Sequence, residues 1–164
     1  MSQVVATTER DVAAPADRVR QALADYTGTR PRILPEQFSQ YRVESGGEGA
    51  GTHASWRFAA TSKRVREQSV DVTAPDEATL VETDRNSSMV TRWTVQPAGS
   101  DRSRVAVRTA WNGASGIGGF FERTFAPKGL VRVYDRMLES LERGHRGLTG
   151  GRRRAAGSRG TMGE

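Results

Sequence analysis

Residues 12–19 read Val-Ala-Ala-Pro-Ala-Asp-Arg-Val and join a polar N-terminal segment to an amphipathic one. The preceding residues, 3–11, are rich in valine and threonine and alternate weakly in polarity, a pattern typical of an edge strand. Pro15 suits the first turn of a helix, where its missing N–H costs no hydrogen bond. The apolar side chains that follow recur at helical spacing: Val19, Leu23 and Tyr26. The stretch therefore predicts a strand that runs directly into a helix.

A longer version of the same arrangement closes the chain. A glycine-rich turn over residues 112–119 leads into an apolar stripe at helical spacing, made of Phe121, Phe125, Leu130, Val133, Tyr134, Met137, Leu138 and Leu141. Pro127 and Gly129 interrupt this stripe. We therefore expect only a short turn before Pro127 and a main helix from about residue 127 to 143, capped by Gly144.

The segment between the two helices changes to strand periodicity. Residues 27–31 are expected to break the first helix, and Ile33, Leu34 and Phe38 mark a short helical or looped segment. From Tyr41 onward polarity alternates with a period of two. Sequential strands joined by short turns form an antiparallel meander. The predicted strands span residues 41–44, 52–62, 63–72, 78–83, 88–96 and 104–111.

The predicted strands have two distinct faces, because successive side chains of a strand point to opposite sides. One face is mainly apolar and aromatic, with Ala54, Trp56, Phe58, Met89, Trp93, Val95, Val105, Val107, Thr109 and Trp111. The other carries Arg92, Arg104 and Arg108, which we expect to face water. We expect the sheet to curl its apolar face around the terminal helix and to leave room for a cavity.

Length and composition exclude several classes of protein. A chain of 164 residues is expected to form one domain, with a hydrophobic core large enough for stability without disulfide bonds. Without cysteine it has neither disulfides nor thiolate metal sites. Its first residues lack the apolar run of a signal peptide, and no stretch approaches the roughly 20 apolar residues that span a bilayer. We therefore expect a cytoplasmic protein.

The net charge of +6 is concentrated at the C-terminus. Residues 143–164 hold six of the 25 basic residues and one of the 19 acidic ones, which leaves +1 on the rest of the chain. The charge therefore predicts no obligate nucleic-acid partner. We expect one domain over 1–145 and a basic, disordered tail over 146–164. Contact of the arginines at 152–154 with nucleic acid or anionic lipid is an alternative to a solvated terminus.

The motif at 12–19 and the order of elements over residues 3–142 resemble the START-like polyketide cyclase/dehydrase superfamily. The resemblance implies an α+β helix-grip fold, in which a seven-strand antiparallel sheet curls around a long C-terminal helix. In such a fold two short helices are expected between strands 1 and 2, and a cavity between sheet and helix. Family members variously bind lipids, sterols, plant hormones or quinones, and some cyclise and aromatise polyketides. Fold analogy does not choose among these functions.

The candidate ligand contacts are the large side chains that point toward the expected cavity. Aromatic rings bury much area, and Trp or Tyr adds a polar group that can orient a ligand. The alternative is that they only fill the core. Gln68, and Arg66 deeper along the strand, face inward if Val70 and Val72 do, whereas a bulge would replace them by Glu67. The alternative for this charged run is a solvated strand face. The candidates are Trp56, Phe58, Gln68, Met89, Trp93 and Trp111 on the sheet, and Phe121, Phe125, Leu130, Tyr134 and Met137 on the helix.

Two segments are candidates for a lid over the cavity. The glycine run at 113–119 has neither the spacing nor the context of a phosphate-binding loop, and Gly116 and Gly118 are expected to gate the cavity mouth. The family resemblance implies that the segment 27–38, which includes Leu34 and Phe38, faces the same end and forms the lid.

No catalytic constellation is recognisable. His53 is the one histidine of the expected folded domain. It is on the strand face opposite that of Trp56 and has no serine motif beside it, so we expect it to lie on the surface. A metal site is not expected, nor is a cofactor. In the aromatase/cyclase branch the resemblance implies a pocket arginine. Here Trp56-Arg57 and Arg92-Trp93 are adjacent pairs, and neither pair can place both residues in one cavity.

These observations favour a non-catalytic protein, monomeric or homodimeric, that binds or carries a small hydrophobic molecule. A polyketide aromatase/cyclase-type enzyme is the first alternative. An interaction module that uses the arginine-rich tail is the second.

Overall fold

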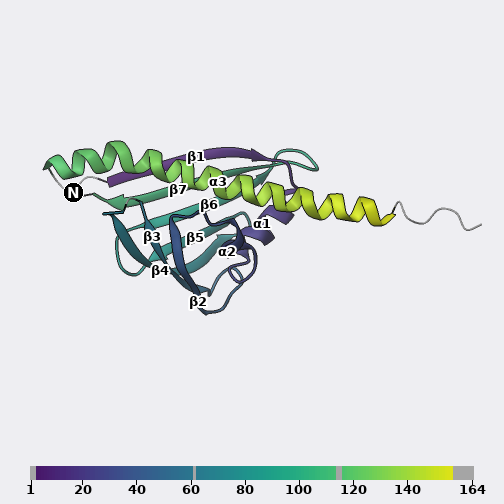
Figure 1. Cartoon of the computed structure of the whole chain (residues 1–164), viewed down its shortest axis with the longest axis horizontal. Helices are drawn as coiled ribbons and strands as arrows, with labels where there is room; N and C mark the ends of the chain where they lie inside the picture. Colours follow the sequence, from purple (N-terminus) through teal and green to yellow (C-terminus); the bar gives the residue numbers. More distant parts are fainter. Residues whose placement is uncertain (1–2, 61, 114–115, 157–164) are drawn as a thin grey trace, which may run out of the picture.

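The computed structural model describes residues 3–60, 62–113 and 116–156, with side chains in these ranges except for 116–126 and 148–156. The described chain forms one antiparallel sheet, two short helices and one long helix (Figure 1). The helices are α1 (Ala16–Ala24), α2 (Thr29–Ile33) and α3 (Gly116–Ala156). The strands are β1 (Gln3–Val12), β2 (Phe38–Ser45), β3 (His53–Ala59), β4 (Val65–Asp76), β5 (Thr79–Asp84), β6 (Val90–Pro97) and β7 (Ser103–Asn112).

The sheet confirms the predicted α+β architecture of seven antiparallel strands with a C-terminal helix. Its strand order is β1-β7-β6-β5-β4-β3-β2. Strands β2 to β7 form a meander in which each strand pairs with its neighbours in sequence, whereas β1 pairs with the distant β7. Helices α1 and α2 connect β1 to β2, as predicted for two short helices.

Alternating burial along the strands confirms the two predicted faces. The outward side chains Arg92, Arg104 and Arg108 are exposed or partly exposed, whereas Met89, just before β6, is buried. The inward face joins α1 and α3 in one hydrophobic cluster. Its buried members on β6 and β7 are Trp93, Val95, Val105, Val107 and Trp111.

The segment between α1 and β2 differs from the prediction. The first helix ends before residues 27–31, as predicted, since α1 stops at Ala24, but the second helix, α2, already begins at Thr29 and holds Pro31 inside it. Proline is compatible with the first turn of a helix, because N–H groups there have no acceptor within the helix. Leu34 follows α2 directly. Phe38 begins β2 instead of belonging to a helical or looped segment, and it pairs with Phe58 of β3.

Helix α3 is continuous, so the predicted division at Pro127 and Gly129 is wrong. A proline inside a helix removes one backbone hydrogen bond and costs about 3 kcal/mol. Burial of the following side chains on the sheet offsets this cost, and each such side chain contributes roughly 1.5–3 kcal/mol. The buried stripe consists of Leu130, Val133, Tyr134, Met137, Leu138 and Leu141.

Both predicted ends of α3 are also corrected. Gly116 and Gly118 are helical, so the glycine-rich turn is shorter than predicted. At the other end the helix passes Gly144, the predicted cap, and its backbone continues to Ala156, within the segment whose composition predicts disorder. A glycine lowers helix stability by about 1 kcal/mol relative to alanine, which weakens a helix without ending it.

Polar contacts attach the outer side of α3 to β1, beside which it runs in Figure 1. Thr8 Oγ1 donates to Asp135 Oδ1 over 3.3 Å, and Arg10 Nη1 lies 3.2 Å from Glu139 Oε1. These contacts hold α3 against the first strand of the sheet. Among the described helices, none is long and apolar enough to cross a membrane.

Candidate functional site

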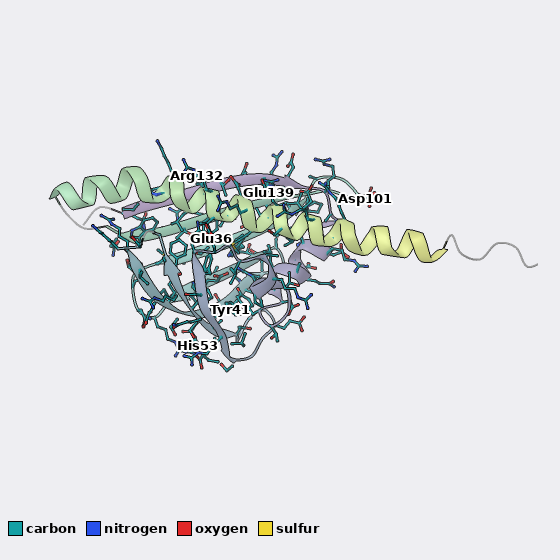
Figure 2. All side chains as sticks on the ribbon, viewed as in Figure 1. Glu36, Tyr41, His53, Asp101, Arg132 and Glu139 are labelled. Atoms are coloured by element: carbon teal, nitrogen blue, oxygen red, sulfur yellow. The ribbon has the colours of Figure 1, made fainter. Side chains whose placement is uncertain are left out.

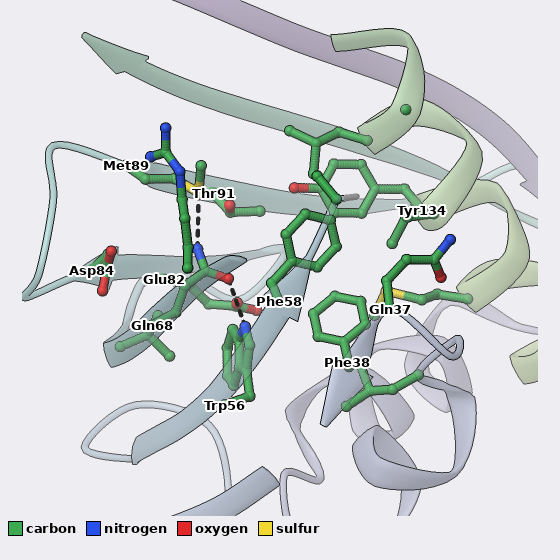
Figure 3. A pocket seen from close by; sticks show the side chains of 18 of the residues that line it. Gln37, Phe38, Trp56, Phe58, Gln68, Glu82, Asp84, Met89, Thr91 and Tyr134 are labelled. Atoms are coloured by element: carbon green, nitrogen blue, oxygen red, sulfur yellow. Dashed lines mark hydrogen bonds between the residues drawn. The ribbon is translucent and has the colours of Figure 1, made fainter. Parts of the chain in front are cut away.

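A cavity of about 490 Å³ lies between the concave sheet face, the segment from α2 to β2, and α3 (Figure 3). Small-molecule sites have volumes of about 300–1,000 Å³, so the cavity is large enough for a compound of several rings. Residues of α2, α3 and every strand from β2 to β7 line it. The space is therefore a product of the whole fold.

Four aromatic side chains of β2 and β3 form one wall of the cavity. We call Phe38, Tyr41, Trp56 and Phe58 the aromatic wall. The Tyr41 and Trp56 rings stack at 9° with centroids 5.9 Å apart, and the Phe38 centroid lies 5.1 Å from that of Phe58 and 6.2 Å from that of Trp56. Aromatic faces at such spacings attract further rings in offset or edge contacts. The wall therefore favours a flat, ring-containing occupant.

Gln68 of β4 gives this wall a polar partner. Trp56 Nε1 donates to Gln68 Oε1 over 2.6 Å, and Gln68 Nε2 contacts Met89 Sδ at 2.9 Å, both drawn in Figure 3. The β3–β4 register runs without a shift, with Trp56 opposite Gln68. Gln68 therefore faces the cavity, as predicted if no bulge intervenes. Its bonds fix the Trp56 indole in one orientation.

Tyr134 links the helix wall of the cavity to the sheet. Its hydroxyl makes a short hydrogen bond with Thr109 Oγ1, which bonds in turn to Thr91 Oγ1 over 2.8 Å. Its ring meets that of Trp93 edge to face, with centroids 5.3 Å apart. Burial raises the pKa of Tyr134 to about 12, although the bond to Thr109 acts in the opposite direction. The phenol is therefore neutral over the physiological range.

A buried cluster of Tyr26, Arg30 and Glu82, here the charged cluster, lies at another side of the cavity. Arg30 Nη2 donates to Glu82 Oε1 over 2.5 Å and to the Tyr26 hydroxyl over 3.1 Å, and Tyr26 donates to the same Glu82 oxygen over 3.0 Å. Arg30 Nε also donates to the carbonyl oxygen of Leu23 over 2.7 Å. Arg30 and Glu82 are only 3% and 5% exposed.

Burial and opposite charges set the protonation of this cluster. Burial raises the pKa of Tyr26 far above its ordinary value; the charge of Arg30 opposes the shift and that of Glu82 adds to it. For Arg30, burial is the largest influence and would lower the pKa, but the attraction and hydrogen bond of Glu82, together with Tyr26 and Tyr41, leave the pKa raised. The guanidinium also lies over the rings of Tyr26 and Trp93, 4.7 and 4.8 Å from their centroids. The cluster therefore holds a protonated arginine beside a neutral tyrosine.

Asp25 shapes the turn that presents Arg30. Its carboxylate accepts hydrogen bonds from the backbone N–H groups of Gly28 and Thr29, at 2.9 and 3.0 Å, and from the Thr29 hydroxyl at 3.1 Å. The Asp25 carbonyl accepts the N–H of Arg30. The bond from Gly28 is the main reason that the pKa of Asp25 is lowered, against the effect of burial. Arg30 thus projects from the start of α2, which this turn holds with little freedom.

Exposed basic side chains border the cavity. We call Lys63, Arg64, Arg66, Arg132 and Arg136 the basic rim; they come from the β3–β4 hairpin, β4 and α3. The two carboxylates that line the cavity, those of Glu82 and Asp84, are both buried. Asp84 accepts bonds from the Ser69 and Asn86 N–H groups and the Ser87 hydroxyl. Among the described residues, the outer part of the site is therefore positively charged.

The structure brings most of the predicted site residues together. Those lining the cavity are Trp56, Phe58, Gln68, Met89, Trp93, Trp111, Leu130, Tyr134 and Met137, with the predicted lid residues Leu34 and Phe38. The side chains of Phe121 and Phe125 lie outside the described part of the chain, and Gly116 and Gly118 are described only as backbone of α3. Whether these residues contact or admit a ligand stays a prediction.

The charged cluster and Tyr41 are absent from the sequence-based candidates. In β5 the sequence Thr-Leu-Val-Glu-Thr-Asp offers an apolar residue on either parity, so hydrophobicity does not indicate that Glu82 points inward. The turn containing Arg30 indicates only a helix boundary. Only the alternation of side chains along β5 could have indicated the position of Glu82. Leu80, Glu82 and Asp84 project from the same side of the strand, so all three point inward if that side faces the cavity.

Other groups of polar residues in the described part of the chain offer no second site. His53 Nε2 lies 2.6 Å from Ser69 Oγ, but both are on the outer face of the sheet, and Figure 2 shows His53 at the end remote from α3. Arg57 and Arg92 are exposed, in agreement with the expectation that neither shares the cavity with its neighbouring tryptophan. Within the described residues, no three His, Asp or Glu side chains are grouped to hold a metal ion.

Comparison with solved structures shows what the fold resembles. The KanY protein, solved by NMR, is 45% identical, with a TM-score of 0.78 over 87% of this chain and 97% of its own. A START superfamily protein from Mycobacterium smegmatis is 14% identical, with a TM-score of 0.68 over 88% and 98%. The ZhuI aromatase/cyclase from Streptomyces sp. R1128 is 19% identical, with a TM-score of 0.60 over 95% and 99%. The last two likenesses show the fold alone.

Sequence comparisons give the family. The curated protein sequences contain no significant match. A family model described as polyketide cyclase/dehydrase and lipid transport matches residues 3–145, which include every strand and the buried part of α3. The chain therefore belongs to the polyketide cyclase/dehydrase and lipid transport family.

Proposed function

We propose that this protein binds or carries a small hydrophobic, ring-containing molecule in the cavity between the sheet and α3. The observation that carries the proposal is the aromatic wall beside about 490 Å³ of space. An occupant that covers these rings removes apolar surface from water, at roughly 25 cal/mol per Å². Family and fold fit hydrophobic ligand binding.

Two glycines of α3 provide a matched test. Gly129 lines the cavity and Gly144 does not, and a Cβ atom added at either position meets nothing within 4 Å. Replacing a helical glycine also removes an unfavourable backbone entropy term, so neither variant should unfold the protein. Gly129→Phe is expected to lower the affinity for a neutral hydrophobic dye by about tenfold or more, and Gly144→Phe to leave it unchanged.

Native mass spectrometry of protein purified from its own host complements this test. A retained molecule that Gly129→Phe excludes would support the proposal and give the molecule's mass. Protein that is uniformly empty and also ignores a panel of hydrophobic dyes would overturn it. Equal dye binding by the Gly129 and Gly144 variants would show that dyes bind outside the cavity.

A polyketide aromatase/cyclase-type activity is the second candidate, because the cavity is not purely apolar. Tyr26, Arg30 and Glu82 are charged or polar groups that could orient an enol or carbonyl during ring closure. The decisive assay compares the products of a reactive poly-β-ketone with and without protein. A product distribution identical to spontaneous cyclisation would exclude this function and leave the carrier function in place.

A further inference from the structure

The charged cluster uses only part of its hydrogen-bonding capacity. Glu82 accepts both of its bonds through Oε1, and Arg30 donates through Nε and Nη2. Oε2 of Glu82 and Nη1 of Arg30 form no hydrogen bond to the described residues. Neither atom is among the fully buried polar atoms that lack a hydrogen-bond partner, so each has accessible space beside it. Because Arg30 and Glu82 both line the cavity, that space is the cavity.

From this arrangement we propose that Arg30 and Glu82 act together as a donor and acceptor pair that selects a ligand bearing a neutral hydroxyl group, such as a phenol, enol or alcohol. The inference rests on the proposed function and names the polar group of its ligand. One hydroxyl can accept from Nη1 and donate to Oε2 at the same time. An ether or ketone oxygen accepts but cannot donate, so it leaves Oε2 without a partner.

Charge favours a neutral group at this position. The Arg30 charge is already balanced by Glu82 at 2.5 Å. A ligand carboxylate here would bring a second negative charge beside Glu82 in a buried environment, and an ammonium group would meet Arg30 in the same way. A hydroxyl adds no net charge and satisfies both atoms. A bond to a charged partner is also stronger than one between neutral groups.

The pair is held in place before any ligand arrives. The Leu23 carbonyl and the Tyr26 hydroxyl hold the guanidinium, the Trp93 ring lies against it, and Asp25 fixes the turn before Arg30. Tyr26 likewise holds Glu82 through Oε1. Because little side-chain freedom remains, a hydroxyl that binds here does not have to order the site. The same rigidity prevents the pair from turning to suit an ether.

Three probes of similar shape test the inference on the full chain: 2-naphthol, 2-methoxynaphthalene and 2-methylnaphthalene. Calorimetry or fluorescence gives the affinity of each. A purely apolar cavity would favour the methyl and methoxy compounds, because they are more hydrophobic. The donor and acceptor pair predicts the reverse order, with 2-naphthol bound at least about tenfold more tightly than 2-methoxynaphthalene.

Glu82→Gln sharpens the comparison, because glutamine has nearly the same side-chain shape but lacks the negative charge that accepts the hydrogen bond from the ligand hydroxyl. Its ratio of 2-naphthol to 2-methoxynaphthalene affinity is expected to fall toward one, while 2-methylnaphthalene still binds. Equal wild-type affinities for the hydroxyl and methoxy probes would overturn the inference and leave the proposed function intact, even if Glu82→Gln does not fold. An unchanged ratio in a folded Glu82→Gln would also overturn it. If none of the probes binds, the proposed function fails and the inference fails with it.

Discussion

Arg30 of α2 and Glu82 of β5 are 52 positions apart in the sequence and form a buried ion pair, with 2.5 Å between Nη2 and Oε1. Removing one partner of such a pair leaves an uncompensated charge in the interior, which typically costs about 3–5 kcal/mol. Replacing both partners by apolar residues of similar size is often close to neutral. Single and double substitutions at this pair should therefore differ strongly in their effect on the free energy of unfolding.

The first prediction follows from this difference. Arg30→Met and Glu82→Leu should each lower the free energy of unfolding by about 3–5 kcal/mol, and the double variant should lose less than either single one. Urea denaturation measures all four proteins. The exposed pair of Arg85 and Asp71 is the control, since removing one of its members should have a much smaller effect. Additive losses at Arg30 and Glu82 would show that the two charges are not coupled.

The second prediction concerns fluorescence. The chain has three tryptophans, Trp56, Trp93 and Trp111, and all of them line the cavity. A bound ring compound should therefore change the intrinsic emission in a saturable way, with the same dissociation constant that calorimetry gives. Binding by calorimetry without any change in emission would place the ligand elsewhere.

The third prediction concerns alkaline pH. The chain has three tyrosines, and burial raises the pKa of all of them, that of Tyr134 to about 12. The folded protein should therefore show almost no phenolate absorbance at pH 10, where an unfolded tyrosine is about half ionised. Half-ionisation of even one tyrosine at pH 10 in folded protein would contradict this prediction.

The same shifts fix the direction of stability against pH. The folded tyrosine pKa values lie above the unfolded value of about 10, so the folded state retains protons that the unfolded state has lost. The tyrosine contribution is fully present below pH 10 and is lost as pH rises from 10 through the folded values. Urea midpoints measured between about pH 9 and 11 should fall with pH. Tyr134→Phe should weaken that dependence.

The fourth prediction concerns the basic rim. Arg132 and Arg136 are exposed cavity-lining residues one turn apart on α3, and Figure 2 shows where Arg132 lies on the helix. Replacing both by glutamine should weaken binding of an anionic naphthalene sulfonate dye and reduce its salt dependence, because exposed charges act over a Debye length of about 10 Å. Arg143→Gln, on the same helix outside the cavity lining, should have no such effect. Equal losses for both variants would indicate a general charge effect.

Much of the fold follows from local patterns in the sequence. Alternation with a period of two places Trp56 and Gln68, or Trp93 and Trp111, on the correct face because the β3–β4 and β6–β7 ladders run without a register shift. The antiparallel order follows from the short turns between strands. These features depend on neighbours in sequence, and a single sequence contains that information.

The remaining features depend on partners far apart in the chain. Glu82 and Arg30 each look like surface residues in their own segments, and only the folded chain supplies the opposite charge. Pro127 and Gly144 are local signals for a helix end, yet burial of Leu138 and its neighbours against the sheet keeps the helix intact around them. Local rules miss such cases because tertiary packing outweighs the propensity of one residue.

The pairing of β1 with β7 has a consequence for folding. Val12 lies opposite Ser103, and Gln3 lies opposite Asn112, so this ladder closes a loop of about a hundred residues. Closing such a loop costs chain entropy before any contact compensates for it, and proteins with many distant contacts fold slowly. Helix α3 comes later still in the chain. During synthesis the tryptophan-bearing face therefore stays uncovered until the last strand and helix emerge, and this interval is when the chain is most exposed to aggregation.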